Sequence, residues 1–400
     1  MSLELAIVAA MDPVHNPYAP GAGRTPMALV GRDAQREAWR IALQRADAGR
    51  SAQSFVLYGL RGVGKTVLLS MLTRDAAHRK WIVAQVEAAA GKRLRAALSE
   101  ALHAPLADLA RPSAGRRVLQ GLKTALSFKA SVDAIGSWSF GVDLAETVGG
   151  GADTGSMETD LAKLVRDLSA AAREEGIGLA ILIDEAQDLV GDELTAVCAA
   201  AHLAAQNDWP CLFALAGLPS LPRVLAEAKS YAERLFTFER IEHLDDDLAR
   251  EALIEPAAAE GVAWDDDAIG LIVAEAQGYP YFLQQFGQET WNEAARSPIT
   301  YADARVGAVR GRAALDDGFF RVRWDRATRS EQQYLRALAV DGDEGGSSSE
   351  VARRLGRPPT SFGPARASLI SKGIVYAPEH GAIAFTVPGM AEFIQRQPEP

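Results

Sequence analysis

Short apolar runs alternate with amphipathic stretches over the first 240 residues, and this alternation predicts an α/β domain. Apolar, β-favouring runs lie near residues 55, 81, 180, 212 and 236. Between them, apolar residues recur every three to four positions, which is the period of a helix with one buried face. The run at 178–183 is apolar without a break, as in strands buried inside a parallel sheet. We therefore expect a mostly parallel five-stranded sheet with helices between its strands.

Two segments depart from this alternation. Residues 1–27 are rich in proline and glycine, so we expect an extended N-terminal arm there. Within the core, two alternating segments at 125–133 and 137–144 predict an inserted β-hairpin at about 125–144. The core itself is expected to span 28–240.

After residue 240 only helical periods remain until the last part of the chain. Acidic triplets at 245–247 and 265–267 suit helix N-termini, and Gly278 followed by Pro280 marks the end of one helix and the start of another. These features predict a helical lid at 241–315.

The tail predicts a third unit at 316–400. Three helices are expected at 330–340, 347–355 and 359–372, followed by short strands at 374–376 and 382–386. This order is that of a winged helix-turn-helix.

The bulk composition is that of a globular protein with two or three domains. The chain has 400 residues, 48% hydrophobic and 24% charged, and a net charge of −10. This charge argues against a wholly nucleic-acid-binding surface but allows a local basic patch. Cys198 and Cys211 form no paired motif, which favours a reducing cytoplasm. No apolar run approaches the ~20 residues of a membrane span, so no membrane contact is expected.

The strongest chemical signal is the glycine-rich loop that follows the first predicted strand. Residues 59–66 follow the pattern G-x-x-x-x-G-K-T, and an apolar helical stretch comes next. Glycines let successive backbone N–H groups point at phosphate oxygens, and the helix adds the positive end of its dipole. In such a loop Lys65 reaches the β- and γ-phosphates of ATP and Thr66 holds Mg²⁺. The candidate nucleotide-binding residues here are Gly59, Arg61, Gly62, Val63, Gly64, Lys65, Thr66 and Val67. The alternative is a strand-to-helix turn that binds nothing.

A second strand ends in two acids. The 178–183 run is followed by Asp184 and Glu185. Beside a phosphate loop, Asp184 would hold Mg²⁺, and Glu185 would position or deprotonate the attacking water. Alone, such a pair is often only a strand end that meets solvent. Together with the loop it predicts an ATPase that uses ATP and Mg²⁺.

The tail carries a basic island on an acidic protein. Between residues 347 and 375 the only acid is Glu350, and the basic residues are Arg353, Arg354, Arg357, Arg366 and Lys372. Clustered positive charge is typical of contacts with the backbone of double-stranded DNA. The alternative is a protein-docking module with a solvated basic face.

With these motifs in order, the chain resembles the AAA+/STAND group of P-loop ATPases, and within it the bacterial and archaeal ATPases related to origin-recognition initiators. The resemblance spans about 28–396. It implies that Val30, Gly31 and Arg32 lie on the adenine side of the nucleotide. It also implies that Lys65 and Glu185 are catalytic. Arg234, before the last core strand, matches the arginine finger that completes a neighbouring subunit's site, which implies a homo-oligomer. Arg240 is the second candidate for the finger.

Two features depart from the family pattern. The end of the fourth strand, at 216–218, lacks the polar sensor common in AAA+ proteins. The lid has Gly278 and Pro280 in place of an arginine sensor, and this is similar to the STAND pattern, in which the proline lies near the nucleotide. Both departures favour a slow switch over a processive motor.

Two functions fit these observations. The first is an ATP-binding and slowly hydrolysing switch that couples nucleotide state to DNA binding by the winged helix. The second is a STAND-type signalling ATPase whose winged helix binds protein. A small-molecule kinase fits poorly, because no acceptor pattern follows Glu185.

Overall fold

The computed structural model describes residues 11–398 except 22, 25, 90–92, 112 and 131–149. The chain divides into two compact units. The sheet unit comprises Asp33–Gly59 and Lys65–Arg240, and the helical unit comprises Met1–Arg32, Leu60–Gly64 and Ile241–Pro400. No helix of the described residues is long and apolar enough to cross a membrane.

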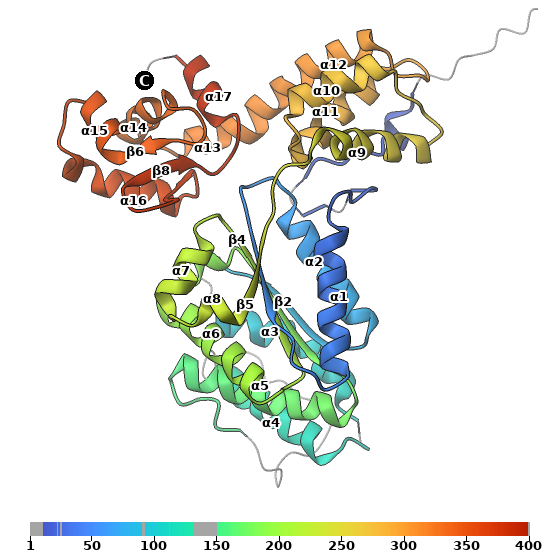
Figure 1. Ribbon diagram of the computed structural model, residues 1–400, viewed down its shortest axis with the longest axis vertical. Helices are drawn as coiled ribbons and strands as arrows, with labels where there is room; N and C mark the ends of the chain where they lie inside the picture. Colours follow the sequence, from blue (N-terminus) through green and yellow to red (C-terminus); the bar gives the residue numbers. More distant parts are fainter. Residues whose placement is uncertain are drawn as a thin grey trace, which may run out of the picture. The chain divides into compact units, whose positions relative to one another are not determined.

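The sheet unit contains the predicted five-stranded sheet. The strands are β1 (Ser54–Tyr58), β2 (Ile82–Glu87), β3 (Leu179–Asp184), β4 (Cys211–Gly217) and β5 (Phe236–Arg240). Their order is β2-β3-β4-β1-β5, and every neighbouring pair is parallel. All six residues of β3 are buried, because helices cover both faces of the sheet (Figure 1). The prediction of a buried parallel sheet is confirmed.

Helices pack on each face of this sheet. The first face carries α1 (Asp33–Asp47) and α2 (Lys65–His78) (Figure 1). The other face carries α3 (Leu94–Leu109), α4 (Arg116–Ala130), α5 (Met157–Glu174), α6 (Gly191–Gln206), α7 (Leu221–Ala228) and α8 (Ala232–Leu235). A 3₁₀ turn, η2 (Ala186–Asp188), follows β3. The helices that the sequence predicts between the strands are present.

The prediction of the first hairpin strand is wrong. Residues 125–130 belong to α4, whose buried positions Val118, Leu122, Ala125 and Phe128 recur every three to four residues. The alternation at 125–133 is the end of this longer helical pattern, which packs on α5. The remainder of the predicted hairpin, 131–144, lies outside the described residues.

The lid consists of four main helices in the helical unit. These are α9 (Asp246–Ala259), α10 (Asp266–Ala276), α11 (Pro280–Glu293) and α12 (Tyr301–Ala314). A π-helical turn, η3 (Leu315–Phe320), continues α12 into α13 (Arg321–Asp325). Asp245 caps α9 by accepting from the backbone N of Leu248 at 2.9 Å, whereas Asp265 makes no such side-chain cap.

The N-terminal arm is anchored in this lid. After the 3₁₀ turn η1 (Pro13–His15), the Tyr18 ring is 1% exposed. Its hydroxyl donates to the carbonyl oxygen of Leu253 at 2.5 Å and accepts from the indole N–H of Trp264 at 3.0 Å. The arm is therefore part of the lid's core.

The tail contains the three predicted helices and the two predicted strands in order, with a further strand, β6, and a further helix, α17. It contains α14 (Arg329–Ala339), β6 (Gly346–Ser347), α15 (Ser348–Arg354), η4 (Pro359–Phe362), α16 (Gly363–Ser371), β7 (Val375–Tyr376), β8 (Ala382–Phe385) and α17 (Met390–Arg396). The three strands form a small antiparallel sheet in the order β6-β8-β7. Ser347 caps α15, because its hydroxyl accepts from the backbone N of Ser349 at 3.2 Å.

Candidate nucleotide-binding site

The loop between β1 and α2 has the backbone that its sequence predicts. Gly62 and Gly64 have φ angles of +87° and +93°, which residues with a side chain adopt only with strain. The backbone N of Gly59 instead extends the sheet by donating to the carbonyl oxygen of Gly217 at 3.1 Å. The loop therefore curls at its second and third glycines, while its first stays attached to β4.

Lys65 and Thr66 begin α2 directly after this curl. Lys65 is only 7% exposed, and its Nζ donates to the carbonyl oxygen of Gly59 at 2.9 Å. Thr66 is exposed, and Val67 is half-buried in the same helical turn. The lysine side chain thus folds back over its own loop, where a phosphate group would replace the carbonyl as its partner.

The end of β3 lies against this helix start. The Thr66 hydroxyl donates a hydrogen bond to the Asp184 carboxylate, which also accepts from the backbone N of Glu185 at 2.9 Å. Asp184 is 7% exposed, and this burial raises the pKa of its carboxyl despite the two hydrogen bonds. The structure thereby brings together the loop and the acidic strand.

This donor set fits Mg²⁺. A hydroxyl and a carboxylate oxygen in contact are the hard ligands that Mg²⁺ prefers. A bound cation would also favour the charged form of the buried Asp184. The described residues contain no group of three or more His, Cys, Asp or Glu that could hold a metal ion alone. The residues present therefore suit a metal that arrives with phosphate and water ligands.

Glu185 has an unusual backbone and a specific partner. Its φ and ψ are 49° and 39°, the left-handed region that costs a non-glycine residue free energy. The Gln187 Nε2 donates to its carboxylate at 2.7 Å, and the Gln187 Oε1 accepts from the backbone N of Leu218 at 2.9 Å. A Cβ at Gly217 would overlap that Oε1. Gln187 therefore bridges Glu185 to the end of β4.

Sequence reasoning missed Gln187. The end of β4 has no polar side chain of its own, and the amide that contacts it comes from η2 after the neighbouring strand. The available signals were a glutamine two residues after Glu185 and a glycine, Gly217, opposite it.

The predicted adenine-side residues lie in the helical unit together with the middle of the loop. Arg32 is 9% exposed, and its guanidinium donates to the carbonyl oxygens of Val63 at 3.1 Å and Glu242 at 2.6 Å. Burial lowers the pKa of this guanidinium. Gly31 has a φ of +70°, and Val30 packs against the lid core. These residues fix residue 63 of the loop to the first residues of the lid.

The lid proline lies beside the same loop. Pro280 is the first residue of α11, and the backbone N of the next residue, Tyr281, donates to the carbonyl oxygen of Gly62 at 3.3 Å. The backbone N of Arg61 donates to the carbonyl oxygen of Thr386 at 2.9 Å. Within the helical unit, residues 60–64 therefore contact both the lid and the tail.

The two candidates for the arginine finger lie at opposite ends of strand β5. Arg234 is exposed in α8, before the amino end of β5. Arg240 is at the carboxyl end of β5, paired in register with Tyr58 just before the loop. Because the strands are parallel, Arg240 lies at the same end of the sheet as Asp184, and Arg234 lies toward the opposite end.

Intramolecular contacts occupy most of the predicted DNA-binding residues. Three form ion pairs, and the pairs are Arg353 with Glu350, Arg354 with Asp341 and Lys372 with Glu331. Arg366 donates to the Ser348 hydroxyl at 3.2 Å and to the carbonyl oxygen of Ala382 at 3.0 Å. Arg357 is exposed. Much of the basic island is therefore neutralised within the tail.

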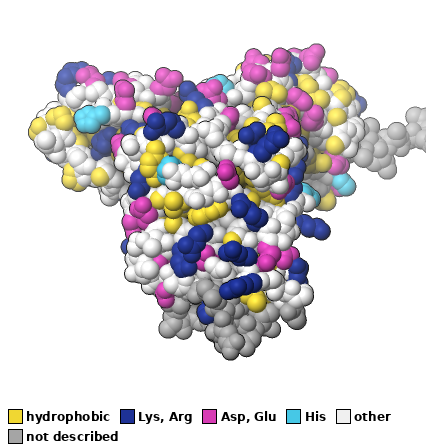
Figure 2. Space-filling model, turned by 60° about the horizontal axis from the view of Figure 1, so that its bottom comes forward, with side chains coloured by type: hydrophobic (Ala, Val, Ile, Leu, Met, Phe, Trp, Pro, Cys, Tyr) yellow, Lys and Arg dark blue, Asp and Glu magenta, His cyan; other side chains and the backbone are white. Residues whose placement is uncertain are grey.

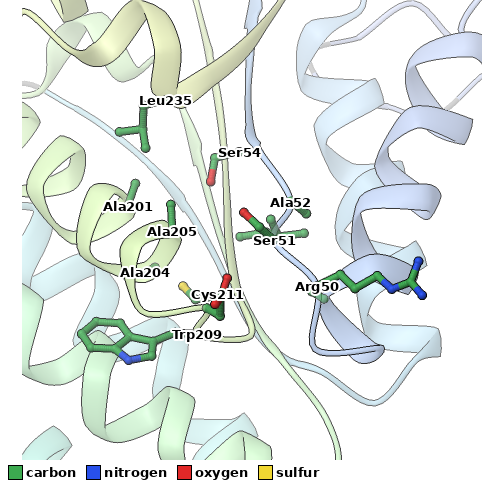
Figure 3. A pocket seen from close by; sticks show the side chains of 13 residues that line it. Arg50, Ser51, Ala52, Ser54, Ala201, Ala204, Ala205, Trp209, Cys211 and Leu235 are labelled. Carbon is green, nitrogen blue, oxygen red and sulfur yellow. The ribbon is translucent and has the colours of Figure 1, made fainter.

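A small cavity at the amino ends of β1 and β4 is not the nucleotide site. Its volume is about 20 Å³, and Ser54, Trp209 and Cys211 are among its lining residues (Figure 3). This volume holds about one water molecule. It lies at the opposite ends of the strands from Asp184.

Family models and solved structures agree with this geometry. Residues 28–225 match the family described as the AAA ATPase domain, and residues 317–394 match a domain of unknown function, DUF8462. No curated protein matches the sequence.

Among solved structures, the chain is similar to the Walker-type ATPase PABY2304 of Pyrococcus abyssi. The identity is 15% and the TM-score 0.57, over 92% of this chain and 96% of that one. It is also similar to Cdc6p from Pyrobaculum aerophilum, with 15% identity and a TM-score of 0.48 over 97% and 98% of the two chains. The first likeness shows a shared fold. The matched family, the parallel sheet and the glycine loop against Asp184 together identify residues 28–225 of this chain as an AAA ATPase domain.

Proposed function

We propose that this chain binds ATP with Mg²⁺, hydrolyses it slowly and acts as a nucleotide-dependent switch. The contact between Thr66 at the start of α2 and Asp184 at the end of β3 carries this proposal. It joins a phosphate cradle and a carboxylate pair in one place, as ATP hydrolysis requires.

Each residue of the site has a distinct role. Lys65 leaves the Gly59 carbonyl and binds the β- and γ-phosphates, while the backbone N–H groups of the loop bind their oxygens. Thr66 and Asp184 hold Mg²⁺, which when bound neutralises charge on the phosphates. Glu185 orients the attacking water and accepts its proton, and Gln187 fixes the Glu185 carboxylate.

The switch depends on contacts that the loop makes within the helical unit. Arg32 and Tyr281 bond residues 63 and 62, so a nucleotide that reshapes the loop changes what the lid contacts. Pro280 holds the start of α11 beside these bonds. Arg234 lies away from its own site, which suits a finger that completes the site of a second copy.

The experiment that tests the ATPase compares three forms of the chain. Lys65→Ala is expected to abolish ATP binding, because it removes the buried lysine side chain that lies over the phosphate loop. Glu185→Gln is expected to bind ATP normally and release phosphate at least ~100-fold more slowly. Normal phosphate release by Glu185→Gln would remove Glu185 from the mechanism.

The tail gives two candidates for what the switch controls. If it is a winged helix that grips double-stranded DNA, exposed Arg357 must act with charges that are now paired. The ion pairs of Arg354 and Lys372 favour the second candidate, a module that docks on protein. Phosphate contacts weaken steeply with salt. A gel shift with double-stranded DNA that is present at low salt and lost in Arg357→Glu supports the first candidate. The absence of any shift at low salt supports the second.

A further inference from the structure

A hollow on the sheet unit lies away from the nucleotide site. Its volume is about 430 Å³, and it is bordered by the start of α4, the second half of α5 and the turn before β4. That turn precedes the amino end of β4, whereas Asp184 closes the carboxyl end of β3. The hollow therefore lies toward the amino ends of the strands, opposite the ends at which Asp184 lies.

Positive charge dominates the border of this hollow. Arg117, Arg166 and Arg173 line it, and all three are exposed. The one acid in the lining is Glu174, whose carboxylate accepts from the backbone N of Arg117 at 3.0 Å and so caps α4. Figure 2, which brings the α4–α5 side of Figure 1 forward, shows Lys and Arg side chains gathered there.

The acids near these arginines leave charge unbalanced. Asp167 pairs with Arg166 at 2.9 Å and with Lys163 at 3.2 Å, so one carboxylate serves two cations. Arg173 donates to the main-chain carbonyl oxygen of Asp208, and this contact does not neutralise the charge of the guanidinium. Helix α4 as a whole has four basic residues and no acid. This local excess stands out on a chain with a net charge of −10.

The wall and floor of the hollow suit a flat polar ligand. Trp209 lines the hollow and is half-buried, on the same turn as Cys211 (Figure 3). Ser169 also lines it and is 1% exposed, and its hydroxyl is hydrogen-bonded to the thiol of Cys211.

We propose that this hollow binds single-stranded nucleic acid, with the three arginines on phosphates and one base against Trp209. Guanidinium groups pair with phosphate oxygens, and an indole stacks on any base. In a duplex the bases stack on each other inside the helix, so a base cannot enter a concave site without being flipped out. An acidic peptide would satisfy the arginines but would leave the indole without a stacking partner.

The test is fluorescence anisotropy of the full-length chain with a labelled 12-nucleotide oligothymidine. Three neutralised phosphates give a slope of about −2 in log K against log salt for a single strand. Binding should therefore weaken ~20-fold between 50 and 200 mM salt. The double variant Arg117→Glu/Arg166→Glu should bind at least ~10-fold more weakly, and Trp209→Leu about 10-fold more weakly.

Arg223→Glu is the matched control, because Arg223 is an exposed arginine on α7 that pairs with its helix neighbour Glu227. It should bind like the unaltered chain. Circular dichroism melts of all variants confirm that they fold. No binding at 50 mM salt, or equal binding by the double variant and the control, would overturn the proposal. So would tighter binding of a polyglutamate peptide or of a duplex of the same length.

Discussion

Gln187 offers the sharpest test of how the site positions its acid. Its amide makes two hydrogen bonds, one to the Glu185 carboxylate at 2.7 Å and one from the backbone N of Leu218 at 2.9 Å. A hydrogen bond to a charged group contributes about 1.5–3 kcal/mol. If all of this free energy orients Glu185 in the transition state, its loss lowers kcat by roughly 10- to 100-fold.

Two substitutions separate the two bonds. Gln187→Glu keeps an oxygen for the Leu218 N–H but removes the donor to Glu185, so it should lower kcat. It also places a second negative charge beside Glu185, and the repulsion between the two carboxylates displaces the Glu185 side chain. Gln187→Ala removes both bonds and should also lower the unfolding free energy by about 1–2 kcal/mol.

The assay is steady-state phosphate release with ATP varied over a range of pH, alongside thermal unfolding. The expected pattern is a lower kcat with an unchanged KM for both variants. Gly217→Ala, on β4, should also lower kcat, because its Cβ would displace the Gln187 oxygen. A folded Gln187→Ala protein with kcat within twofold of the unaltered chain would refute the reasoning.

Three further predictions concern stability. Gly278→Ala should lower the free energy of unfolding by ~3 kcal/mol or more in urea, since its φ is +70° and its Cβ would overlap a main-chain oxygen. Gly64→Ala should lower it by only about 1 kcal/mol, because its φ is +93° but its Cβ would meet open space. Glu331 is buried, but hydrogen bonds led by that from Lys372 outweigh burial and lower the pKa of its carboxyl to about 2. Its stabilisation of the fold, about 3 kcal/mol, should therefore be present above pH 4.5 and be lost as the pH falls toward 2. In Glu331→Gln the melting temperature should depend less on pH over that range. Tyr18→Phe should lower stability by about 1–3 kcal/mol by tryptophan fluorescence, because it leaves the Leu253 carbonyl without its donor.

Local patterns predicted the sheet and the backbone of its glycine loop well. The loop sequence at 59–66 implies positive φ at glycines, and the structure has it at Gly62 and Gly64. The unbroken apolar run before Asp184 implies a strand buried on both faces, and β3 is one. Both signals depend on neighbours in sequence, which is why one chain suffices to read them.

The failures involve contacts between distant residues. The basic island at 347–375 pairs with acids outside that range, because Arg354 contacts Asp341 and Lys372 contacts Glu331, which lie 13 and 41 residues earlier. Gln187 acts on β4, a neighbour in space that its own sequence does not reveal. The hairpin at 125–144 was drawn from a window that began inside α4, so its helical period was cut short.

The central claim is that Thr66 and Asp184 hold the metal of a bound Mg·ATP, and calorimetric titration of ATP with and without Mg²⁺ tests it most directly. The unaltered chain should bind ATP at least ~10-fold more tightly with Mg²⁺, and Asp184→Asn should show no such difference. ATP binding that ignores Mg²⁺ in the unaltered chain, or no binding at millimolar ATP, would contradict the account.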